Sequence, residues 1–363
     1  MIDGKLLRRL NAESRTARLA ALEAACAGAD FPAPDPRCIN NHIHTRYSFS
    51  PYSPSAAVYA ARAAGLCACG IVDHDSMGGA EEFIEAGRIA GIPTTVGIEC
   101  RVSMAGTPFA GRRTNNPDQL GISYMVLHGV PHRNIARVQA YFQPLRERRN
   151  ERNRAMLERI NARMGLALDF ARDVLPLSEF SDGGTVTERH LMLALARALR
   201  PGLGLLEEYD MVGALKKACI PEVYIPAGGE CPSLEEITAF AADIGAILCY
   251  AYLGDVTESV TGDKRAQAFE DAYLEELLDT LASAGVRALT YMPTRNTDAQ
   301  LARIGALAER CGMMQICGED INSPRQSFVI EKLKEPRFQH LIESTWAVIR
   351  HENDYASTGG EGA

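Results

Sequence analysis

The stretch Cys38–His44 reads CINNHIH, and it begins the repeat that decides the fold. This short apolar run ends in two histidines, and a segment of helical composition, SPSAAVYAARAAGL (53–66), follows it. The pattern returns as CACGIVDHD (67–75) before GGAEEFIEAGRIAG (78–91), and PTTVGIEC (93–100) is the third apolar run. Short strands that alternate with helices are typical of a parallel sheet or an α/β barrel.

Further strand-like runs extend the repeat along the chain. They read GISYMVLHGV (121–130), GAILCYAYLG (245–254), VRALTYMP (286–293) and MMQICGED (313–320). In an α/β barrel, residues at the carboxyl ends of the strands form the active site. We therefore expect the polar side chains that end these runs to meet at one mouth: His42, His44, Asp73, His74, Glu99, His128, Tyr252, Tyr291 and Asp320.

The rest of the chain divides around these runs. We expect a helical extension and a proline-rich linker over residues 1–37, and the first part of the barrel over 38–133. Residues 134–219 are mostly helical in pattern and would form an inserted lid or cap, before the second part of the barrel over 220–325. Residues 326–363 would hold one helix and a polar, glycine-rich, mobile tail.

Composition narrows the class of protein. The chain has 363 residues, of which 46% are hydrophobic, so a sizeable core is available. A net charge of −8 disfavours non-specific nucleic-acid binding, and we expect a small-molecule partner instead. No apolar run reaches the ~18 residues of a membrane span, and no signal-peptide pattern opens the chain. Ten scattered cysteines without a CxxC pair indicate reduced thiols in a cytoplasmic protein.

His42 and His44 form the core of a candidate metal site. Two residues apart on a strand, their side chains point to the same face. Imidazole suits Zn, Fe or Mn, and the carboxylates of Glu99 and Asp320 would complete a set of four ligands. A bound ion lowers the pKa of its water and polarises a phosphoryl or carbonyl oxygen. HxH alone is a weak signal, and the ordered series of strand ends strengthens it.

The motifs HIH (42–44), VDHD (72–75), GIE (97–99) and GED (318–320) occur in an order that resembles the PHP (polymerase and histidinol phosphatase) superfamily. The late helical stretch ERHLMLALARAL (188–199) also fits its stand-alone bacterial phosphoesterases. The resemblance covers most of the chain between the two terminal segments. It implies a distorted (β/α)7 barrel with an inserted helical subdomain, and hydrolysis of phosphoesters with two or three Zn, Mn or Fe ions.

Several positions depart from the family's ligand pattern. His42, His44, His74, Glu99 and Asp320 match it, while Phe49, Tyr124, Tyr252 and Asn322 stand where the family has other ligands. The resemblance assigns His42, His44, Glu99 and Asp320 to the first ion, and this set is complete. We therefore predict one ion per chain, or two if His128 restores a second site. The loop SFSPYSP (48–54) would then pack over the vacated third site.

The remaining candidates have ordinary alternatives. His74, with Asp73 beside it, and His128 are predicted to handle protons, although His74 could simply orient a neighbour. The resemblance suggests that phosphate or substrate contacts Arg149, Arg152, Arg189 and His190. A solvated or surface helix face is the alternative for these four.

Three functions stay open at this point. The first is a metal-dependent hydrolase of a small phosphoester, such as a phosphomonoester or a nucleotide-like compound. The second is a single-metal enzyme that acts on a non-phosphate ester or amide, or a lyase, because a fold does not fix a function. The third is a degenerate member that binds a ligand and catalyses nothing, which the four lost ligands would explain.

Overall fold

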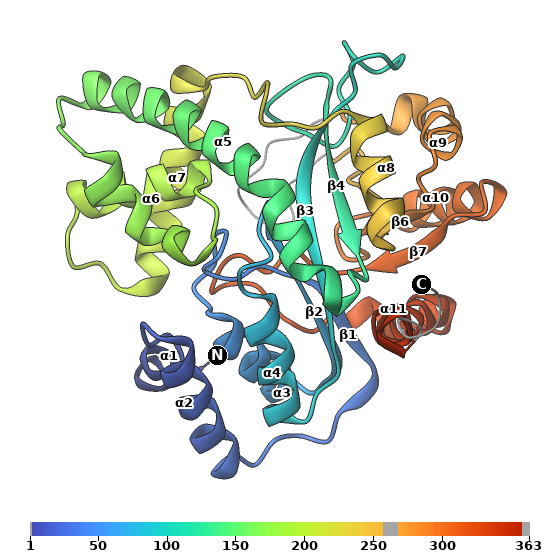
Figure 1. The fold of residues 1–363 in the computed structure, drawn as a ribbon, viewed down its shortest axis with the longest axis horizontal. Helices are drawn as coiled ribbons and strands as arrows, with labels where there is room; N and C mark the ends of the chain where they lie inside the picture. Colours follow the sequence, from blue (N-terminus) through green and yellow to red (C-terminus); the bar gives the residue numbers. More distant parts are fainter. Residues whose placement is uncertain (1, 257–267, 358–363) are drawn as a thin grey trace, which may run out of the picture.

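A seven-stranded sheet lies at the centre of the computed structural model, which describes residues 2–256 and 268–357 (Figure 1). Its strands follow one another in chain order across the sheet. They are β1 (Asp35–Ile43), β2 (Leu66–His74), β3 (Thr94–Ser103), β4 (Ile122–His128), β5 (Ile247–Tyr252), β6 (Ala288–Tyr291) and β7 (Met314–Cys317).

The sheet curls until its first and last strands meet. Ile43 forms a parallel bridge with Ile321, just beyond β7. The backbone N–H of His44 donates to the Ile321 carbonyl (3.1 Å), and the Ile321 N–H donates to the His42 carbonyl (3.0 Å). The prediction of a PHP-type barrel is therefore confirmed, and its closure brings His42, near the end of β1, and His44, directly after it, beside Asp320.

Strand β4 differs from the expected pattern, because it runs antiparallel to both β3 and β5. The expectation that every strand presents its carboxyl end at the mouth is wrong for this strand. A polar loop over residues 104–121, without a crossover helix, reverses the chain between β3 and β4. Tyr124 therefore lies toward the mouth, opposite Arg101, while His128 lies opposite Ile247, the first residue of β5.

Helices cover the outside of the barrel and one of its ends. The outer helices are α3 (Pro54–Ala63), α4 (Ala80–Ala90), α8 (Leu234–Ile244), α9 (Leu274–Ser283) and α10 (Asp298–Arg310) (Figure 1). Small and medium apolar side chains from alternate strand positions fill the interior, among them Val72, Val126 and Ile316. Val348 of α11 (Gln339–Ser357) joins this cluster, so that α11 packs against the barrel opposite the mouth.

The helical insertion forms a lobe with a hydrophobic core of its own. It contains α5 (Ile135–Met164), α6 (Glu188–Leu199) and α7 (Leu205–Val223), seen on the left of Figure 1. The predicted boundaries between the segments of the chain stay predictions. Residues 358–363 of the predicted mobile tail lie outside the described residues.

A buried ion pair attaches the N-terminal helices, α1 (Gly4–Leu10) and α2 (Arg15–Ala27), to the barrel. Arg18 of α2 pairs with Glu82 of α4 at 2.6 Å, and both side chains are almost fully buried. We predict that Arg18→Ala lowers the free energy of unfolding by about 3 kcal/mol, since it leaves the Glu82 carboxylate buried without its counter-ion. This expected loss is small for a broken buried ion pair, because the backbone N–H and the hydroxyl of Ser55 still donate to Glu82. Urea denaturation measures the loss.

The neighbouring pair of Arg15 and Glu81 is the matched control for this prediction. It joins the same two helices, but its side chains are 44% and 64% exposed. Arg15→Ala should therefore change stability by less than about 1 kcal/mol. Equal effects of the two substitutions would contradict a structural role for the buried pair.

Glu352 of α11 is a buried carboxyl that makes stability depend on pH. Its Oε1 accepts from the backbone N–H of Val96, and Oε2 lies 3.4 Å from Nε2 of His132. Burial raises the pKa of Glu352 to about 7, against 4.5 in an exposed carboxyl, although His132 and Val96 lower it. As pH rises from 4.5 to about 7, Glu352 loses its proton in the unfolded chain before it does so in the folded protein. The free energy of unfolding therefore falls across this range.

We predict that Glu352→Gln removes this dependence. The amide still accepts from Val96 and cannot ionise, so at pH 8 the variant should be more stable than the wild type by about 3 kcal/mol. At pH 4 the two proteins should be equally stable. Thermal or urea unfolding across this range measures the difference. Glu343→Gln, at an exposed position of the same helix, should leave the pH profile unchanged.

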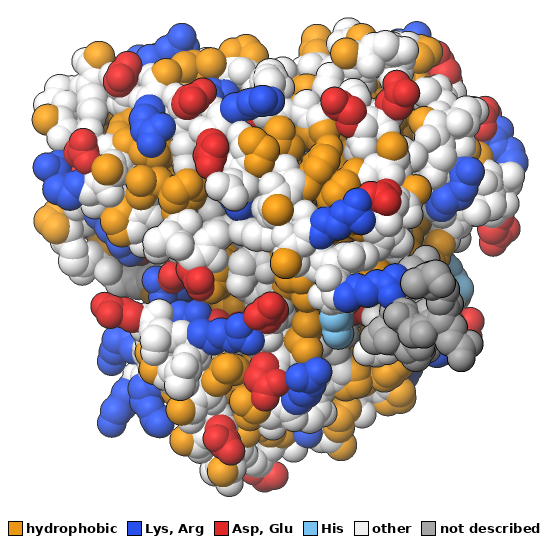
Figure 2. Space-filling view, viewed as in Figure 1, with side chains coloured by type: hydrophobic (Ala, Val, Ile, Leu, Met, Phe, Trp, Pro, Cys, Tyr) orange, Lys and Arg blue, Asp and Glu red, His pale blue; other side chains and the backbone are white. Residues whose placement is uncertain are grey.

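The surface shows no large region of one charge on the face in Figure 2, where acidic and basic side chains are interspersed. Within residues 2–256 and 268–357, no helix has both the length and the apolarity needed to cross a membrane.

Candidate metal centre

The four predicted metal ligands converge at the mouth of the barrel. Nε2 of His44 lies 3.2 Å from Oδ1 of Asp320 and 3.6 Å from Oε2 of Glu99. Nε2 of His42 lies 3.7 Å from the same Glu99 oxygen. His42 lies in β1 and His44 directly follows it, Glu99 lies in β3, and Asp320 follows β7, so only the closed barrel brings them together.

His74, at the end of β2, joins this cluster. Its Nδ1 lies 3.0 Å from Oε2 of Glu99. Two overlapping groups have ligand atoms within 4.8 Å of one another: His42, His44 and Asp320, and His44, His74 and Glu99. His74 was predicted to handle protons, and the geometry also makes it a candidate ligand.

The charges of the cluster suit a cation. Burial alone would raise the pKa of Glu99, but the facing His74 and His42 hold it well below its usual range. Burial also opposes ionisation of Asp320, and here His44 lowers the pKa of the carboxyl. Burial lowers the pKa of His74, which favours a neutral imidazole that can donate a lone pair.

His44 carries the sharpest sign that the cluster fits a metal ion. Its Nε2 is buried and completes no hydrogen bond, although it points between two carboxylates. Its Nδ1 lies 3.2 Å from the hydroxyl of Ser48, which in turn donates to Asp73 at 2.6 Å. A metal ligand typically has its second ring nitrogen held in this way. Together with the imidazoles of His42 and His74 and the two carboxylates, this nitrogen provides the kinds of donor atom that Zn, Mn or Fe binds.

Asp73 supports this arrangement from behind. Its carboxylate accepts from the backbone N–H of Thr45 at 2.6 Å, from the Thr45 hydroxyl and from Ser48. These contacts fix the turn that follows His44. Asp73 was predicted to assist catalysis beside His74, and the structure places it as a holder of the His44 side chain instead of a group that lines the pocket.

The structure shows what Phe49 and Asn322, two of the residues that depart from the family's ligand pattern, contact. The Phe49 ring packs 5.2 Å from those of His190 and Tyr209, and so belongs to the hydrophobic core of the insertion. The side-chain amide of Asn322 donates to Oδ1 of Asp320 at 2.5 Å. Phe49 therefore fills space between the barrel and the insertion. The Asn322 amide is hydrogen-bonded to one carboxylate oxygen of Asp320, a predicted metal ligand.

The two tyrosines among the departures both line the pocket. The Tyr124 ring lies 6.0 Å from that of His74. The Tyr252 hydroxyl donates to Oδ1 of Asp271 at 2.7 Å, away from the ligand cluster. Tyr291, a further predicted strand-end residue, donates to Oε1 of Gln315 at 2.9 Å.

His128 lies deep in the barrel, because β4 is antiparallel. It is 1% exposed and does not line the described pocket, and its Nε2 has no hydrogen-bond partner among the described residues. Burial, together with nearby His42, lowers the pKa of His128 to about 3. The side chain is therefore neutral at pH 7, and its predicted catalytic role stays a prediction that this position does not favour.

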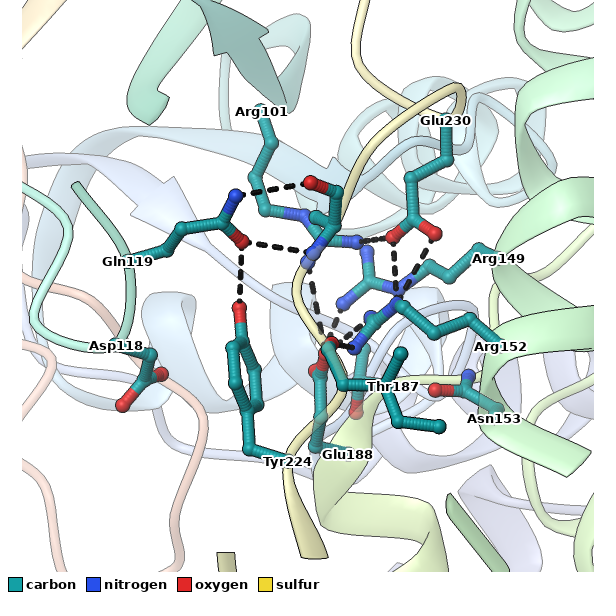
Figure 3. A network of polar contacts seen from close by, with 12 residues as sticks. Arg101, Asp118, Gln119, Arg149, Arg152, Asn153, Thr187, Glu188, Tyr224 and Glu230 are labelled. Atoms are coloured by element: carbon teal, nitrogen blue, oxygen red, sulfur yellow. Dashed lines mark hydrogen bonds and ion pairs between the residues drawn. The ribbon is translucent and has the colours of Figure 1, made fainter. Parts of the chain in front are cut away.

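A network of buried ion pairs joins the insertion to the barrel beside the pocket (Figure 3). Nη2 of Arg152 donates to Oε1 of Glu188 at 2.5 Å, and its Nε donates to both oxygens of Glu230 at 3.0 Å. Arg101 of β3 also pairs with Glu230. Arg149 donates to Glu188 at 3.0 Å, and on its other side to Asp75 at 2.7 Å.

These contacts bear on the predicted substrate-binding residues. Arg149 lines the pocket, but its charge is shared between Asp75 and Glu188. Arg152 lies behind it, paired with Glu188 and Glu230. Three arginines and three carboxylates thus offset one another, so little uncompensated positive charge is left for a phosphate.

Of the other two predicted substrate-binding residues, Arg189 and His190, only Arg189 lines the pocket. Arg189 lines the pocket, beside the Phe49 ring. His190 is buried and accepts from the backbone N–H of Thr187 at 2.9 Å, as part of the N-terminal cap of α6. The structure therefore makes Arg189 the more direct candidate for contact with a substrate.

The pocket itself measures about 140 Å³ and contains side chains that the sequence did not single out. Glu188 immediately precedes the predicted Arg189, so it could have been found from spacing. Lys216 of α7 also lines the pocket, and nothing in the sequence near it indicated this.

Comparison with known proteins finds a matching domain and two solved structures of similar fold. Residues 40–198 match the family model of the PHP domain. One similar solved structure is a protein from Bifidobacterium adolescentis assigned as a metal-dependent phosphoesterase, with a TM-score of 0.61, 22% identity, and coverage of 84% of this chain and 96% of that one. Another is an amidohydrolase from Chromobacterium violaceum with bound sulfate and no metal (TM-score 0.60, 20% identity, 84% and 96% coverage). At these identities the likeness is one of fold.

A shorter match occurs to error-prone DNA polymerases of Mycobacterium tuberculosis and Mycobacterium bovis. It is 35% identical over 92 residues, which make up 25% of this chain and 8% of the polymerase. The fold and the site together define a PHP-type barrel with an inserted helical lobe. Residues 40–198, less than half of the chain, are the part that matches the PHP domain.

Proposed function

We propose that the protein is a metal-dependent hydrolase of a small phosphoester. The observation that carries the proposal is the convergence of His42, His44, Glu99 and Asp320, in which the buried Nε2 of His44 faces both carboxylates without completing a hydrogen bond. The family match and the phosphoesterase among the similar structures support the same reaction class.

We propose that the centre holds one ion per chain. His44 belongs to both candidate ligand groups, and only its Nε2 is available because Nδ1 faces Ser48. Since one imidazole nitrogen binds one ion, the two groups cannot both be complete at once. Zn, Mn and Fe all accept this set of donors.

The bound ion would lower the pKa of a water molecule and polarise a phosphoryl oxygen. The residues of the chain do the rest. His42 and His44 orient their nitrogens from a rigid strand, and the Asp73–Ser48 contacts keep the His44 ring in place. His74 can hold or pass a proton at Nδ1 toward Glu99. Arg189 and Lys216, both at the pocket wall, would offset negative charge on the substrate.

A panel of phosphomonoesters and nucleotides tests this proposal on protein loaded with Mn, Zn or Fe. Release of inorganic phosphate that depends on the metal supports it. If no compound of the panel is hydrolysed with any of the three metals, phosphoester hydrolysis is excluded as the function. Phosphate bound without turnover would then favour the degenerate, ligand-binding alternative.

Hydrolysis of a non-phosphate substrate is the second candidate. It is favoured by the amidohydrolase among the similar structures, and by tyrosines at two positions where the family has other ligands. Metal-dependent turnover of an ester or amide without phosphate release would select it.

A further inference from the structure

A second and larger cavity adjoins the pocket at the metal centre. It measures about 870 Å³, against about 140 Å³ for the pocket, and lies between α7 and the segment that follows β7. Both are lined by Phe49, Lys216 and Asp320, among others, so the two spaces meet. Ligand cavities typically measure ~300–1,000 Å³. The pocket alone can therefore hold little more than the reacting group, and the rest of a substrate needs the larger cavity.

The walls of this cavity suit a bulky and partly aromatic group. Tyr209 and Val212 line it from α7, Met292 from just beyond the end of β6, and Val329 from the segment that follows β7. Tyr224, just beyond α7, adds a second aromatic ring. Charged and polar side chains also line the cavity, among them Asp118, Lys217 and Arg295. Aromatic walls beside such groups suit a planar ring that itself carries hydrogen-bonding groups.

Charged side chains mark the two ends of the cavity. Lys216 lines both spaces and makes no ion pair within the described part of the chain, which places a cation at their boundary. Farther out, Arg325 donates to both oxygens of Asp210 at 2.6 and 2.5 Å, and this pair joins α7 to the segment beyond β7. A substrate whose phosphoryl group lies near Lys216 would extend from there between the aromatic walls.

Gly213 of α7 is the feature that needs an explanation. A glycine inside a helix costs roughly 0.5–1 kcal/mol relative to alanine. Helical glycines are usually explained by close packing, yet a Cβ built at Gly213 would meet nothing within 4 Å. The residue lines the large cavity. Its missing side chain therefore leaves space open in the cavity and relieves no clash.

We infer that the larger cavity binds the leaving-group part of the substrate, that this part is a bulky alcohol of nucleoside size with a planar ring, and that Gly213 sets the upper limit of its size. The inference rests on the proposed function, because it places the reacting phosphoryl group at the metal centre.

A graded series of substitutions at Gly213 tests the inference. Gly213→Ala, Gly213→Leu and Gly213→Trp fill the cavity progressively. We measure kcat/KM for a nucleoside 5′-monophosphate and for phenyl phosphate, and compare their ratio between variants. The ratio should fall with side-chain size, by ~tenfold or more in the tryptophan variant.

Ala214→Trp is the matched control, since Ala214 is the next residue of the same helix, is exposed and lines neither cavity. It should leave the ratio unchanged. An unchanged ratio across the Gly213 series would overturn the inference, as would an equal loss for both substrates, because the residue would then act through the fold.

Binding gives a readout that does not need turnover. Calorimetry on metal-free protein should show the nucleoside monophosphate binding to the wild type and ~tenfold more weakly to Gly213→Trp. If the wild type hydrolyses neither compound, the proposed function fails, and this titration alone then decides the inference. Equal affinities of the two proteins would overturn it.

Discussion

His44→Ala is expected to remove the bound metal and to lower kcat/KM for phosphoester hydrolysis by about a thousandfold, equivalent to roughly 4 kcal/mol of transition-state stabilisation. His44 is the one residue that both candidate ligand groups share, and its Nε2 lies within 3.6 Å of both carboxylates. Without it, neither group keeps three ligands. Elemental analysis of the purified variant, together with steady-state kinetics, measures both losses.

His340→Ala is the matched control, because this histidine is exposed and lies in the first turn of α11, outside the metal centre. Its metal content and kcat/KM should equal those of the wild type. Circular dichroism must show that His44→Ala remains folded. A folded His44→Ala variant that retains its metal and most of its activity would show that the ion binds elsewhere.

Glu230→Ala is expected to lower the free energy of unfolding by about 4–5 kcal/mol. The carboxylate is buried between Arg101 and Arg152, so its removal leaves two guanidinium groups without a partner on that side. Both charges stay in the interior, where desolvation is costly. The loss should therefore exceed that of Arg18→Ala, which strands one carboxylate that keeps other donors. Urea or thermal denaturation measures the change.

Glu222→Ala provides the comparison at the surface. Glu222 of α7 also pairs with an arginine, Arg163, but both side chains are about half exposed. Its removal should cost less than about 1 kcal/mol. A loss of that small size in Glu230→Ala would mean that the buried network in Figure 3 does not hold the insertion to the barrel.

The convergence of the four predicted ligands could be predicted from the sequence because their positions obey local rules. His42 and His44 share a strand face by their spacing, Glu99 lies within β3, and Asp320 follows β7. Each ligand is therefore visible as a motif within a strand or shortly after one. The barrel needs only to close for the four to meet.

The direction of β4 and the role of His128 could not be predicted in the same way. The repeat of strand and helix suggested a parallel neighbour, and His128 followed as a strand-end residue. The loop over 104–121 lacks the helical pattern that a parallel crossover normally contains, which was the available signal. Once β4 is reversed, His128 lies at the far end of the barrel interior.

Charge compensation is harder still to read from a sequence. The arginines of α5 suggest a phosphate site when they are considered alone. Glu188 and Glu230, which neutralise Arg152, lie 36 and 78 residues away along the chain. Gly213 resembles an ordinary helical glycine until the space in front of it is known. Both features depend on how the insertion packs on the barrel.

Metal stoichiometry is the most direct test of a reduced, single-ion centre. Inductively coupled plasma mass spectrometry on protein reconstituted with Mn, Zn or Fe and freed of excess metal gives the number of ions per chain. We predict a value close to one for the wild type and close to zero for His44→Ala. A wild-type value of zero would contradict the metal centre, and a value of two or three would contradict the argument that His44 limits it to one ion.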